Sequence, residues 1–511
     1  MIKSEAETEI KLGGVARFIA TFALMLGAFL FVLDYTIANV AIPYIAGGLG
    51  TGTNEGIYVI TSFAVGNAVV VPMTGWLSKR FGMIRTLAAS LFWFTIFSLF
   101  CGVAPNLLLL SLFRFLQGAA AGPLIPLSQG LLVVIQPKKR IQLILALYAM
   151  VVLVAPVFGP IAGGYFCIYW DWRWIFYINL PVGLFCTFAV YSLLKPLNKS
   201  DPSAKVDFVS FFLLLVGMTA LQIFLDKGQE WDWFGSEKIW IAFVLAFLGI
   251  FYLLLWSRIA KEPLLELGLL KNRSFMIATV IIFFTYSMYF GSIVLIPLWL
   301  QTQMGYNALA AGIAVAPIGL GSIFVSLAVA KILDKIGPVW PMMVGFLIIS
   351  ISNEYVRYFP ENIDRYHIML SRFILGLGIG FWITPLMNMA ALSLPKDKLA
   401  SGLGIFHLVR GISGGVGASL YPTIYLRRQI HQHSNLISNI NDYSESSREY
   451  LSDSKSLELA DVLINQQASV IALNEVFHLM AIVILLLLGV LIFAIKTPKN
   501  RLESSIGLIA D

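Results

Sequence analysis

The chain has 511 residues, of which 58% are hydrophobic and 12% are charged. Soluble domains hold about 45–50% apolar and about 25% charged residues, so this composition excludes a soluble globular protein and indicates a membrane protein with many spans. The formal net charge of +7 reflects an uneven distribution of Lys and Arg between loops, and it gives no reason to expect a nucleic-acid partner.

Apolar runs close to the length of about 20 residues that a helix needs to cross a bilayer occur 14 times along the chain. They occupy residues 18–43, 57–77, 86–103, 108–133, 143–169, 175–194, 207–225, 239–257, 275–299, 309–330, 339–356, 367–394, 402–426 and 475–495. The predicted fold class is therefore an all-α membrane protein with 14 transmembrane helices. We expect no cleavable signal peptide, because the first apolar run is of full spanning length.

Lys and Arg are divided unequally between the two sides of these helices. The loops and tails on the side of both termini hold 23 of the 35 Lys and Arg residues, and the opposite loops hold nine. Because Lys and Arg are enriched in cytoplasmic loops, we expect both termini to be cytoplasmic.

Three short sequences recur at nearly one offset. RFLQGAAAG from Arg114 recurs as RFILGLGIG from Arg372, 258 residues later, VAIP at 40–43 recurs as VLIP at 294–297, and GWLSKRFG at 75–82 recurs as AKILDKIG at 330–337. Two pseudo-symmetric six-helix bundles with two inserted helices explain these repeats, and such paired halves are typical of secondary transporters. The predicted organisation is a cytoplasmic tail at 1–17, a first bundle at 18–195, a linker with the inserted seventh and eighth helices at 196–273, a second bundle at 274–495, and a cytoplasmic tail at 496–511.

Asp34 and Arg114 are ionisable residues within predicted spans, where a charge is costly and usually faces a partner or a cavity. They lie about eight and about six residues from the outer ends of their helices, hence at similar depth. One interpretation makes Asp34 a proton carrier tuned by Arg114, and the other is a static pair that holds two helices in register. Asn39 and Gln117 are neighbouring polar groups suited either to substrate contact or to helix–helix hydrogen bonding.

The fifth predicted span contains VAPVFGPIAGGY at 154–165. Pro156 and Pro160 remove backbone donors, so we expect the helix to bend there. Gly159, Gly163 and Gly164 expose bare backbone, on which another helix can pack closely. Both a gating helix and an ordinary kinked helix with a packing face fit this pattern.

Further candidates for substrate contact lie in the seventh and ninth spans. Asp226 lies near the outer end of the seventh helix, and Tyr286, Met288 and Tyr289 suit an amphipathic ligand, although such a stripe more often serves plain packing.

Arginines outnumber acids at depth. Arg114, Arg372 and Arg410 stand against the one deeply placed acid, Asp34. Because an unpaired buried charge is strongly penalised, this balance predicts a cavity that favours neutral or weakly acidic amphiphiles over multiply charged cations.

The predicted external loop at 427–474 is rich in Ser and Asn. Apolar residues recur within it at roughly helical spacing, namely Leu451, Leu457, Val462, Leu463 and Val470. A solvated loop and an amphipathic helix that meets a partner both fit. No cluster of metal ligands, phosphate-binding glycine loop or paired nucleophile and base is visible, so we expect no metal, no cofactor and no catalytic residue, which disfavours a membrane-embedded enzyme.

Several of these sequences together resemble a known family. LDYTIANVAIP at 33–43, GWLSKRFG at 75–82, RFLQG at 114–118 and APVFGPIAGG at 155–164 resemble the serial motifs of the major facilitator superfamily. WRWIFYINLPVG at 172–183 and LQIFLDKGQEWDWF at 221–234 narrow the resemblance to its 14-helix drug:proton antiporters, and to multidrug efflux transporters of the EmrB type in particular. The resemblance implies an antiporter motif at Pro156 to Gly164, and a periplasmic adaptor protein and an outer-membrane channel as partners.

The sequence and the resemblance together predict a proton-coupled antiporter that exports lipophilic, amphipathic small molecules across a bacterial inner membrane. We expect the lipid bilayer, the substrates, protons and the two pump components as partners, and no nucleic acid. A proton-coupled uptake symporter and an exporter of one specific metabolite are the alternatives.

Overall fold

The computed structural model describes residues 13–56, 58–228, 230–261, 263–438 and 454–495. Within these ranges the regular structure is entirely helical, and 14 helices are long and apolar enough to cross a membrane. The predicted fold class is confirmed. Of the predicted tails, residues 1–12 and 496–511 lie outside the described residues. Residues 14–17, which were assigned to the first tail, belong to α1.

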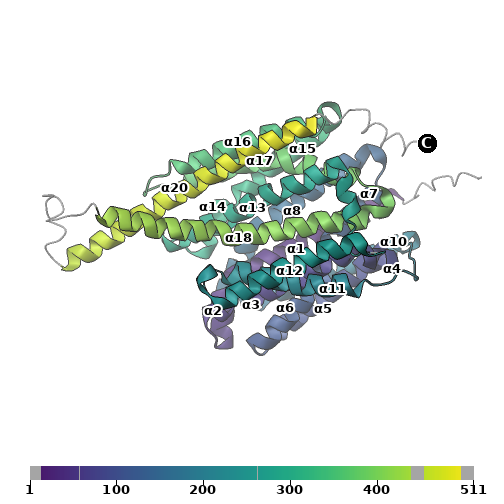
Figure 1. The fold of residues 1–511 in the computed structure, drawn as a ribbon, viewed down its shortest axis with the longest axis horizontal. Coiled ribbons are helices and arrows are strands. Elements are labelled where there is room, and N and C mark those ends of the chain that lie inside the picture. Colours follow the sequence, from purple (N-terminus) through teal and green to yellow (C-terminus); the bar gives the residue numbers. More distant parts are fainter. Residues whose placement is uncertain (1–12, 57, 229, 262, 439–453, 496–511) are drawn as a thin grey trace, which may run out of the picture.

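The helices follow the predicted order (Figure 1). The first six spans are α1 (Gly14–Leu49), α3 (Tyr58–Val70) with α4 (Thr74–Phe81), α5 (Met83–Val103), α6 (Leu107–Ala121) with α7 (Leu124–Ile135), α8 (Ile141–Tyr169) and α10 (Asn179–Leu194); the short helices α2 (Thr53–Gly56) and α9 (Trp174–Tyr177) precede α3 and α10. The inserted pair is α11 (Phe208–Lys227) and α12 (Glu237–Ile259). The last six spans are α13 (Arg273–Thr302), α14 (Ala308–Val315) with α15 (Pro317–Ile336), α16 (Val339–Arg357), α17 (Arg365–Leu392), α18 (Leu399–Ser438) and α20 (Ser454–Ile495).

Side-chain caps fix several helix starts. Asn106, Asp207, Asn307 and Asp364 each accept a hydrogen bond from the backbone N–H three residues further on. Each cap satisfies a backbone donor that has no partner within the first turn. The starts of α6, α11, α14 and α17 are therefore encoded locally.

The two halves share the same close helix crossing. A Cβ added at Gly66 of α3 or at Gly118 of α6 would lie 2.1 Å from a carbonyl oxygen of the other helix. Gly321 of α15 and Gly376 of α17, which follow 255 and 258 residues later in the sequence, meet in the same way. Only glycine permits backbones to approach so closely. This shared crossing supports the repeat that the sequence predicts.

The inserted helix α11 touches both halves. Thr61 of α3 donates to Asp226 Oδ2 over 2.6 Å, and Ser419 of α18 donates to the Leu225 carbonyl oxygen over 2.6 Å. Helix α11 lies beside α18, and α12 packs on α11 (Figure 1). The inserted pair therefore covers one side of the seam between the halves.

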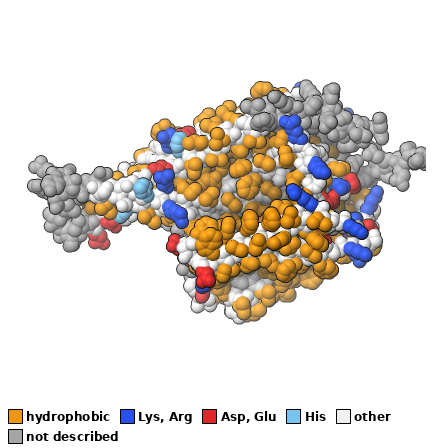
Figure 2. Space-filling model, viewed as in Figure 1, with side chains coloured by type: hydrophobic (Ala, Val, Ile, Leu, Met, Phe, Trp, Pro, Cys, Tyr) orange, Lys and Arg blue, Asp and Glu red, His pale blue; other side chains and the backbone are white. Residues whose placement is uncertain are grey.

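The surface is divided as a membrane protein requires. Figure 2 shows hydrophobic side chains over the long side of the molecule, and Lys and Arg gathered mainly at its right-hand end, where α4 and α10 lie in Figure 1. The apolar band suits contact with lipid, and the basic end agrees with the cytoplasmic side expected from the sequence.

In the segment 427–474, for which the sequence leaves a solvated loop and an amphipathic helix open, the described residues 427–438 and 454–474 are helical. Helix α18 continues unbroken to Ser438 and α20 begins at Ser454, so both extend beyond the rest of the molecule (Figure 1). His433 Nε2 lies 3.1 Å from Asp461 Oδ1 across the two extensions. We call these extensions, residues 427–438 and 454–474, the stalk. Of the two alternatives that the sequence left open, the helical one fits these residues and the solvated loop does not; Leu451 and the side chain of Leu457 lie outside the described residues.

Candidate functional site

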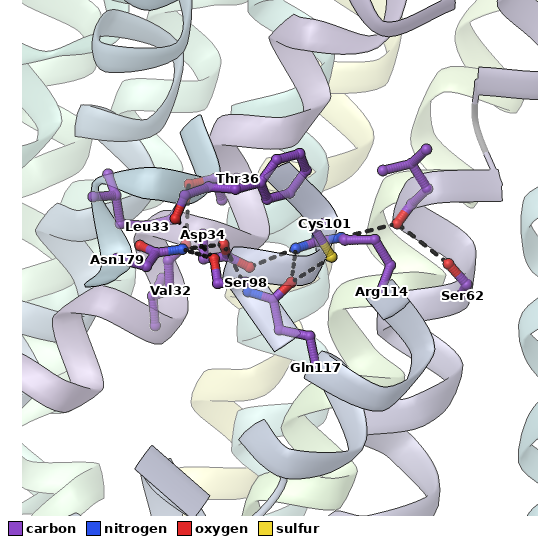
Figure 3. Close-up of polar contacts among 12 residues, drawn as sticks. Val32, Leu33, Asp34, Thr36, Ser62, Ser98, Cys101, Arg114, Gln117 and Asn179 are labelled. Atoms are coloured by element: carbon purple, nitrogen blue, oxygen red, sulfur yellow. Dashed lines mark hydrogen bonds and ion pairs between the residues drawn. The ribbon is translucent and has the colours of Figure 1, made fainter. Parts of the chain in front are cut away.

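A buried ion pair joins α1 and α6 inside the first half of the molecule (Figure 3). Asp34 Oδ2 and Arg114 Nη1 are 2.6 Å apart, and both side chains are 0% exposed. Gln117 Nε2 donates to Asp34 Oδ1 over 3.2 Å, and Asn179 Nδ2 of α10 donates to the same oxygen over 2.6 Å. The Asp34 carboxylate therefore accepts hydrogen bonds from three side chains.

Arg114 is also held on its other sides. Its Nε donates to the Val59 carbonyl oxygen of α3 over 3.2 Å, and its guanidinium lies 4.2 Å from the centroid of the Phe63 ring. Burying two charges removes their hydration, and only good geometry and additional hydrogen bonds compensate for that loss. Protonation of Asp34 would remove the negative charge that Arg114 faces, and it would thereby weaken the bond between them.

The sequence contained most of this cluster. Arg114 and Gln117 are three residues apart on one helix, hence on the same face. Asn179 was missed, although it is a polar residue in an apolar run within WRWIFYINLPVG, which was the available signal. Its Nδ2 also lies 3.0 Å from Ser98 Oγ of α5, so the side chains of the cluster come from four helices of the first half.

A central cavity of about 80 Å³ lies between the two halves, walled by α1, α3, α7, α11, α13 and α18. The ion pair does not line it, but the neighbouring Tyr35 does. Most of the lining is apolar, and the polar side chains that line it are Tyr35, Asn67, Gln222, Tyr286, His407 and Arg410. No Asp or Glu lines this cavity in the part of the chain that the structure describes.

His407 and Arg410 bring buried nitrogen atoms to the cavity wall. His407 Nε2 lies 2.7 Å from Gln129 Oε1 of α7, and the Arg410 guanidinium lies 5.1 Å from the centroid of the Tyr286 ring. His407 Nδ1 and Arg410 Nη1 are buried without a hydrogen-bond partner. His407 has no local signature in the sequence, because it is a lone histidine in an apolar run.

The structure separates the candidates for substrate contact in the ninth span. Tyr286 lines the cavity, as a ligand contact requires. Met288 and Tyr289 are 3% and 4% exposed and lie outside the cavity lining, packed within the second half. Of this stripe, only Tyr286 is placed to touch a ligand here.

The remaining polar candidates lie apart from the ion pair. Asn39 is exposed and sits one turn beyond Tyr35 toward the outer end of α1, so it does not join Asp34. Asp226 accepts from Thr61 and, over 2.9 Å, from Gln222 Nε2. Asp226 therefore contacts the cavity only through Gln222, which lines it.

The arginines differ in what they face. Arg114 is paired with Asp34, and Arg372 Nη1 donates to Ser292 Oγ over 2.6 Å inside the second half. Only Arg410 lines the cavity. The sequence-based charge count therefore overstated the positive charge of the cavity, because it could not tell which arginines point into the bundles.

The glycines of α8 meet two different neighbours. The helix is continuous through Pro156 and Pro160. A Cβ at Gly159 or Gly163 would lie 2.2 or 2.8 Å from an oxygen atom of α1, whereas one at Gly164 would lie 3.5 Å from α14 in the other half. Gly159 and Gly163 thus set the distance between α8 and the helix that carries Asp34, and Gly164 faces the seam.

Metal chemistry has no visible basis in the described ranges. No group of three or more His, Cys, Asp or Glu side chains there is placed to hold a metal ion. Cys101, Cys167 and Cys186 are buried thiols. The arrangement of charges and the cavity instead suit the movement of protons and of an apolar ligand.

Comparison with known proteins agrees with this reading of the fold. A model of the Major Facilitator Superfamily matches residues 24–418. The chain is 37% identical over 495 residues to the fatty acid resistance protein FarB of Neisseria gonorrhoeae, which covers 95% of this chain and 97% of FarB. It is 36% identical over 496 residues to the multidrug export protein EmrB of Escherichia coli, which covers 95% and 97% of the two chains.

A solved structure shows the same architecture. The proton:xylose symporter XylE matches with a TM-score of 0.59 at 13% identity, covering 93% of this chain and 97% of XylE. At that identity the likeness concerns the fold alone. Because the family model spans most of the chain and the relatives match along nearly all of it, the chain belongs to the major facilitator superfamily, whose members are membrane transporters and not enzymes.

Proposed function

We propose that the protein is a proton-coupled antiporter that exports lipophilic, structurally varied small molecules from the cytoplasm. The observation that carries this proposal is the fully buried Asp34–Arg114 pair, one residue away from the cavity-lining Tyr35. A carboxylate at membrane depth that binds and releases a proton changes its bond to Arg114, and thereby moves the helix that walls the cavity. The relatives FarB and EmrB, named for fatty acid resistance and multidrug export, support export as the direction.

The cavity indicates which compounds are carried. Its lining is mostly apolar, with Arg410 as its one charged side chain among the described residues. Arg410 Nη1 is buried without a partner, so an anionic group of a ligand would satisfy it, whereas a cation would be repelled. We assign neutral and weakly acidic amphiphiles as the preferred substrates. This is the preference predicted from the sequence, but it now rests on Arg410 alone.

The small cavity volume supports alternating access. Pockets that enclose drug-sized ligands measure about 300–1,000 Å³, and this cavity measures about 80 Å³. The halves must therefore separate on one side to admit a substrate. Gly164 faces α14 across the seam, so α8 is one of the surfaces that moves.

The stalk is the surface that we assign to an adaptor. Apolar side chains are exposed along it, among them Ile430 at 70%, Leu459 at 55% and Val462 at 47%. Exposed apolar side chains on a helix pair outside the membrane are typical of a site that another protein covers. In the bacterial inner membrane, with both termini cytoplasmic, the stalk would reach a periplasmic adaptor that leads to an outer-membrane channel.

Transport into everted membrane vesicles tests the proposal. With the interior made acid, a lipophilic weak acid distributes passively to the alkaline outside, so its accumulation inside requires the protein. We expect accumulation that collapses with the proton gradient, and that is inhibited more strongly by a second weak acid than by a bis-quaternary cation. Protein-dependent accumulation of a neutral amphiphile only in right-side-out vesicles with an acid exterior would identify an uptake symporter instead. Preferred transport of the dication would overturn the substrate assignment.

A further inference from the structure

Two hydrogen bonds join the halves of the molecule on the cytoplasmic side of the cavity. His407 of α18 is 4% exposed, and Gln129 of α7 is 0% exposed. His407 Nε2 lies 2.7 Å from Gln129 Oε1. Gln129 Nε2 in turn donates to the Met387 carbonyl oxygen of α17 over 3.4 Å. His407 and Met387 belong to the second half and Gln129 to the first, so both bonds join the halves.

This connection lies close to the axis that relates the halves. Gln129 and Met387 are 258 residues apart, which is also the offset between Arg114 and Arg372. Equivalent positions of two related units can touch each other only near the symmetry axis between them. The bond therefore lies at the centre of the seam, where it opposes separation of the halves.

The halves touch each other on this side, beside a cavity of about 2420 Å³ whose lining includes Gly75 and Ser401. A Cβ at Gly75 of α4 would lie 2.3 Å from Ser401 Oγ, and one at Gly404 of α18 would lie 3.3 Å from the Val71 carbonyl oxygen. These contacts lie toward the start of α18, on the side that we assign to the cytoplasm. Opening that side must break the bond between His407 and Gln129.

His407 also differs chemically from the rest of the cavity wall. Among the described lining residues it is the one whose side-chain type ordinarily gains or loses a proton between about pH 5 and 8. Its Nδ1 has no partner, so the neutral ring that donates from Nε2 to Gln129 Oε1 leaves Nδ1 free to accept a proton.

The charged surroundings of His407 oppose a second positive charge. Arg410, three residues further along α18, is the charged group that acts on it. Tyr148 of α8 and Tyr289 of α13 interact with Arg410, and α7 and α17 present the uncharged Gln129 and a carbonyl oxygen. Without an acid to offset two cations, a protonated His407 is more favourable in a state where it has left the seam for water.

From these contacts we propose that His407 is the residue through which a proton opens the cytoplasmic side of the transporter. Neutral His407 holds Gln129 and keeps that side closed. A proton that arrives through the cavity binds Nδ1, the halves separate on the cytoplasmic side, and the proton leaves to the cytoplasm while a substrate can enter. This inference rests on the proposed function and adds a second proton-binding group to it, separate from Asp34.

Distances between spin labels measure the opening directly. Arg85 of α5 and Asp397 are exposed and lie in the first and second half, respectively, on the cytoplasmic side. We would place labels at Arg85→Cys and Asp397→Cys after replacing the three buried native cysteines. Distances are then recorded at about pH 8 and about pH 5.5, which bracket ordinary histidine titration. Full-length protein in lipid nanodiscs is used throughout.

Three variants distinguish the effect of the hydrogen bond between His407 and Gln129 from the effect of proton binding at His407. His407→Gln keeps a donor for Gln129 but cannot take up a proton, so its label distance should stay short at both pH values. His407→Phe lacks the donor and should raise the open fraction about threefold to tenfold at both, as expected for loss of one hydrogen bond. His367→Gln, the same replacement at an exposed histidine outside the seam, should retain the change with pH that the parent protein shows.

The outcomes distinguish the inference from the proposed function. A pH-dependent opening in His407→Gln equal to that of the parent, or no opening in the parent, would overturn the role of His407. Neither result concerns export, which is measured separately in everted vesicles. Failure of export with an intact pH-dependent opening would contradict the proposed function and leave the switch standing.

Discussion

The two halves of the molecule have an arginine at equivalent positions of their fourth helices, but the two arginines have different hydrogen-bond partners. In the first half, Arg114 bonds to the carboxylate of Asp34. In the second half, Arg372 is likewise 0% exposed and bonds to Ser292 and Ser371. Met288 stands 254 residues after Asp34, the offset that relates VAIP to VLIP, so no acid occupies the corresponding position.

This difference indicates that the arrangement of helices within a half does not depend on the ion pair. The second half packs the same crossing of its second and fourth helices around an arginine with neutral partners. The Asp34 carboxylate is therefore not needed to build such a bundle, and a buried ion pair adds little stability by itself. That is the physical ground for assigning Asp34 a part in proton movement.

The largest effect should follow from Asp34→Asn. The amide keeps the shape of the side chain and can still bond to Arg114, as the serines do with Arg372, so the variant should fold. Because it cannot carry a proton, gradient-driven accumulation in everted vesicles should fall to the level of vesicles without the protein. Full accumulation by a folded Asp34→Asn protein would show that the pair is static, as in the alternative interpretation of the sequence.

A second prediction concerns the cation that lines the cavity. Arg410→Gln should reduce transport of a lipophilic weak acid about tenfold or more, the value of one charge-assisted hydrogen bond, and should leave transport of a neutral amphiphile nearly unchanged. Arg410→Lys is the matched control, because it keeps the charge. Equal losses for the acid and the neutral compound would mean that Arg410 supports the fold and does not select the ligand.

The glycines of α8 test packing within the first half against packing across the seam. Gly163→Ala would bring a methyl group to 2.8 Å from an α1 carbonyl oxygen, and overpacking of that kind costs about 1–3 kcal/mol. Gly164→Ala would make an ordinary contact at 3.5 Å and should leave the thermal denaturation midpoint unchanged. A similar loss in both variants would contradict the separate roles of the two positions.

The smallest effect is expected for Arg372→Met. Replacing a buried charged group by an apolar side chain of similar length is often neutral or stabilising, and Arg372 has no carboxylate partner among the described residues to leave behind. The denaturation midpoint should therefore hold or rise. Arg114→Met should lower it, because removing one member of a buried pair costs about 3–5 kcal/mol. A larger loss for Arg372→Met than for Arg114→Met would reverse the comparison between the halves.

The sequence predicted the parts of this molecule that local patterns control. Apolar length alone located all 14 spans, and similar depth in the membrane was enough to pair Asp34 with Arg114. The contribution of Asn179 and the bond between His407 and Gln129 depend on contacts between residues 145 and 278 positions apart, which no periodicity reports. For the stalk, the sequence could not decide between a helix and a solvated loop, because helices that continue beyond the bilayer lose the apolar run that marks them.

Proton release on substrate binding is the most direct test of the role of Asp34. Purified protein in a weakly buffered solution with a pH indicator is mixed with a neutral lipophilic substrate, which contributes no proton of its own. We predict that binding to the parent protein releases protons, and that Asp34→Asn binds the substrate without the part of the release that Asp34 supplies. Equal proton release from both proteins would contradict the assignment of Asp34 as the carboxylate that exchanges a proton for substrate.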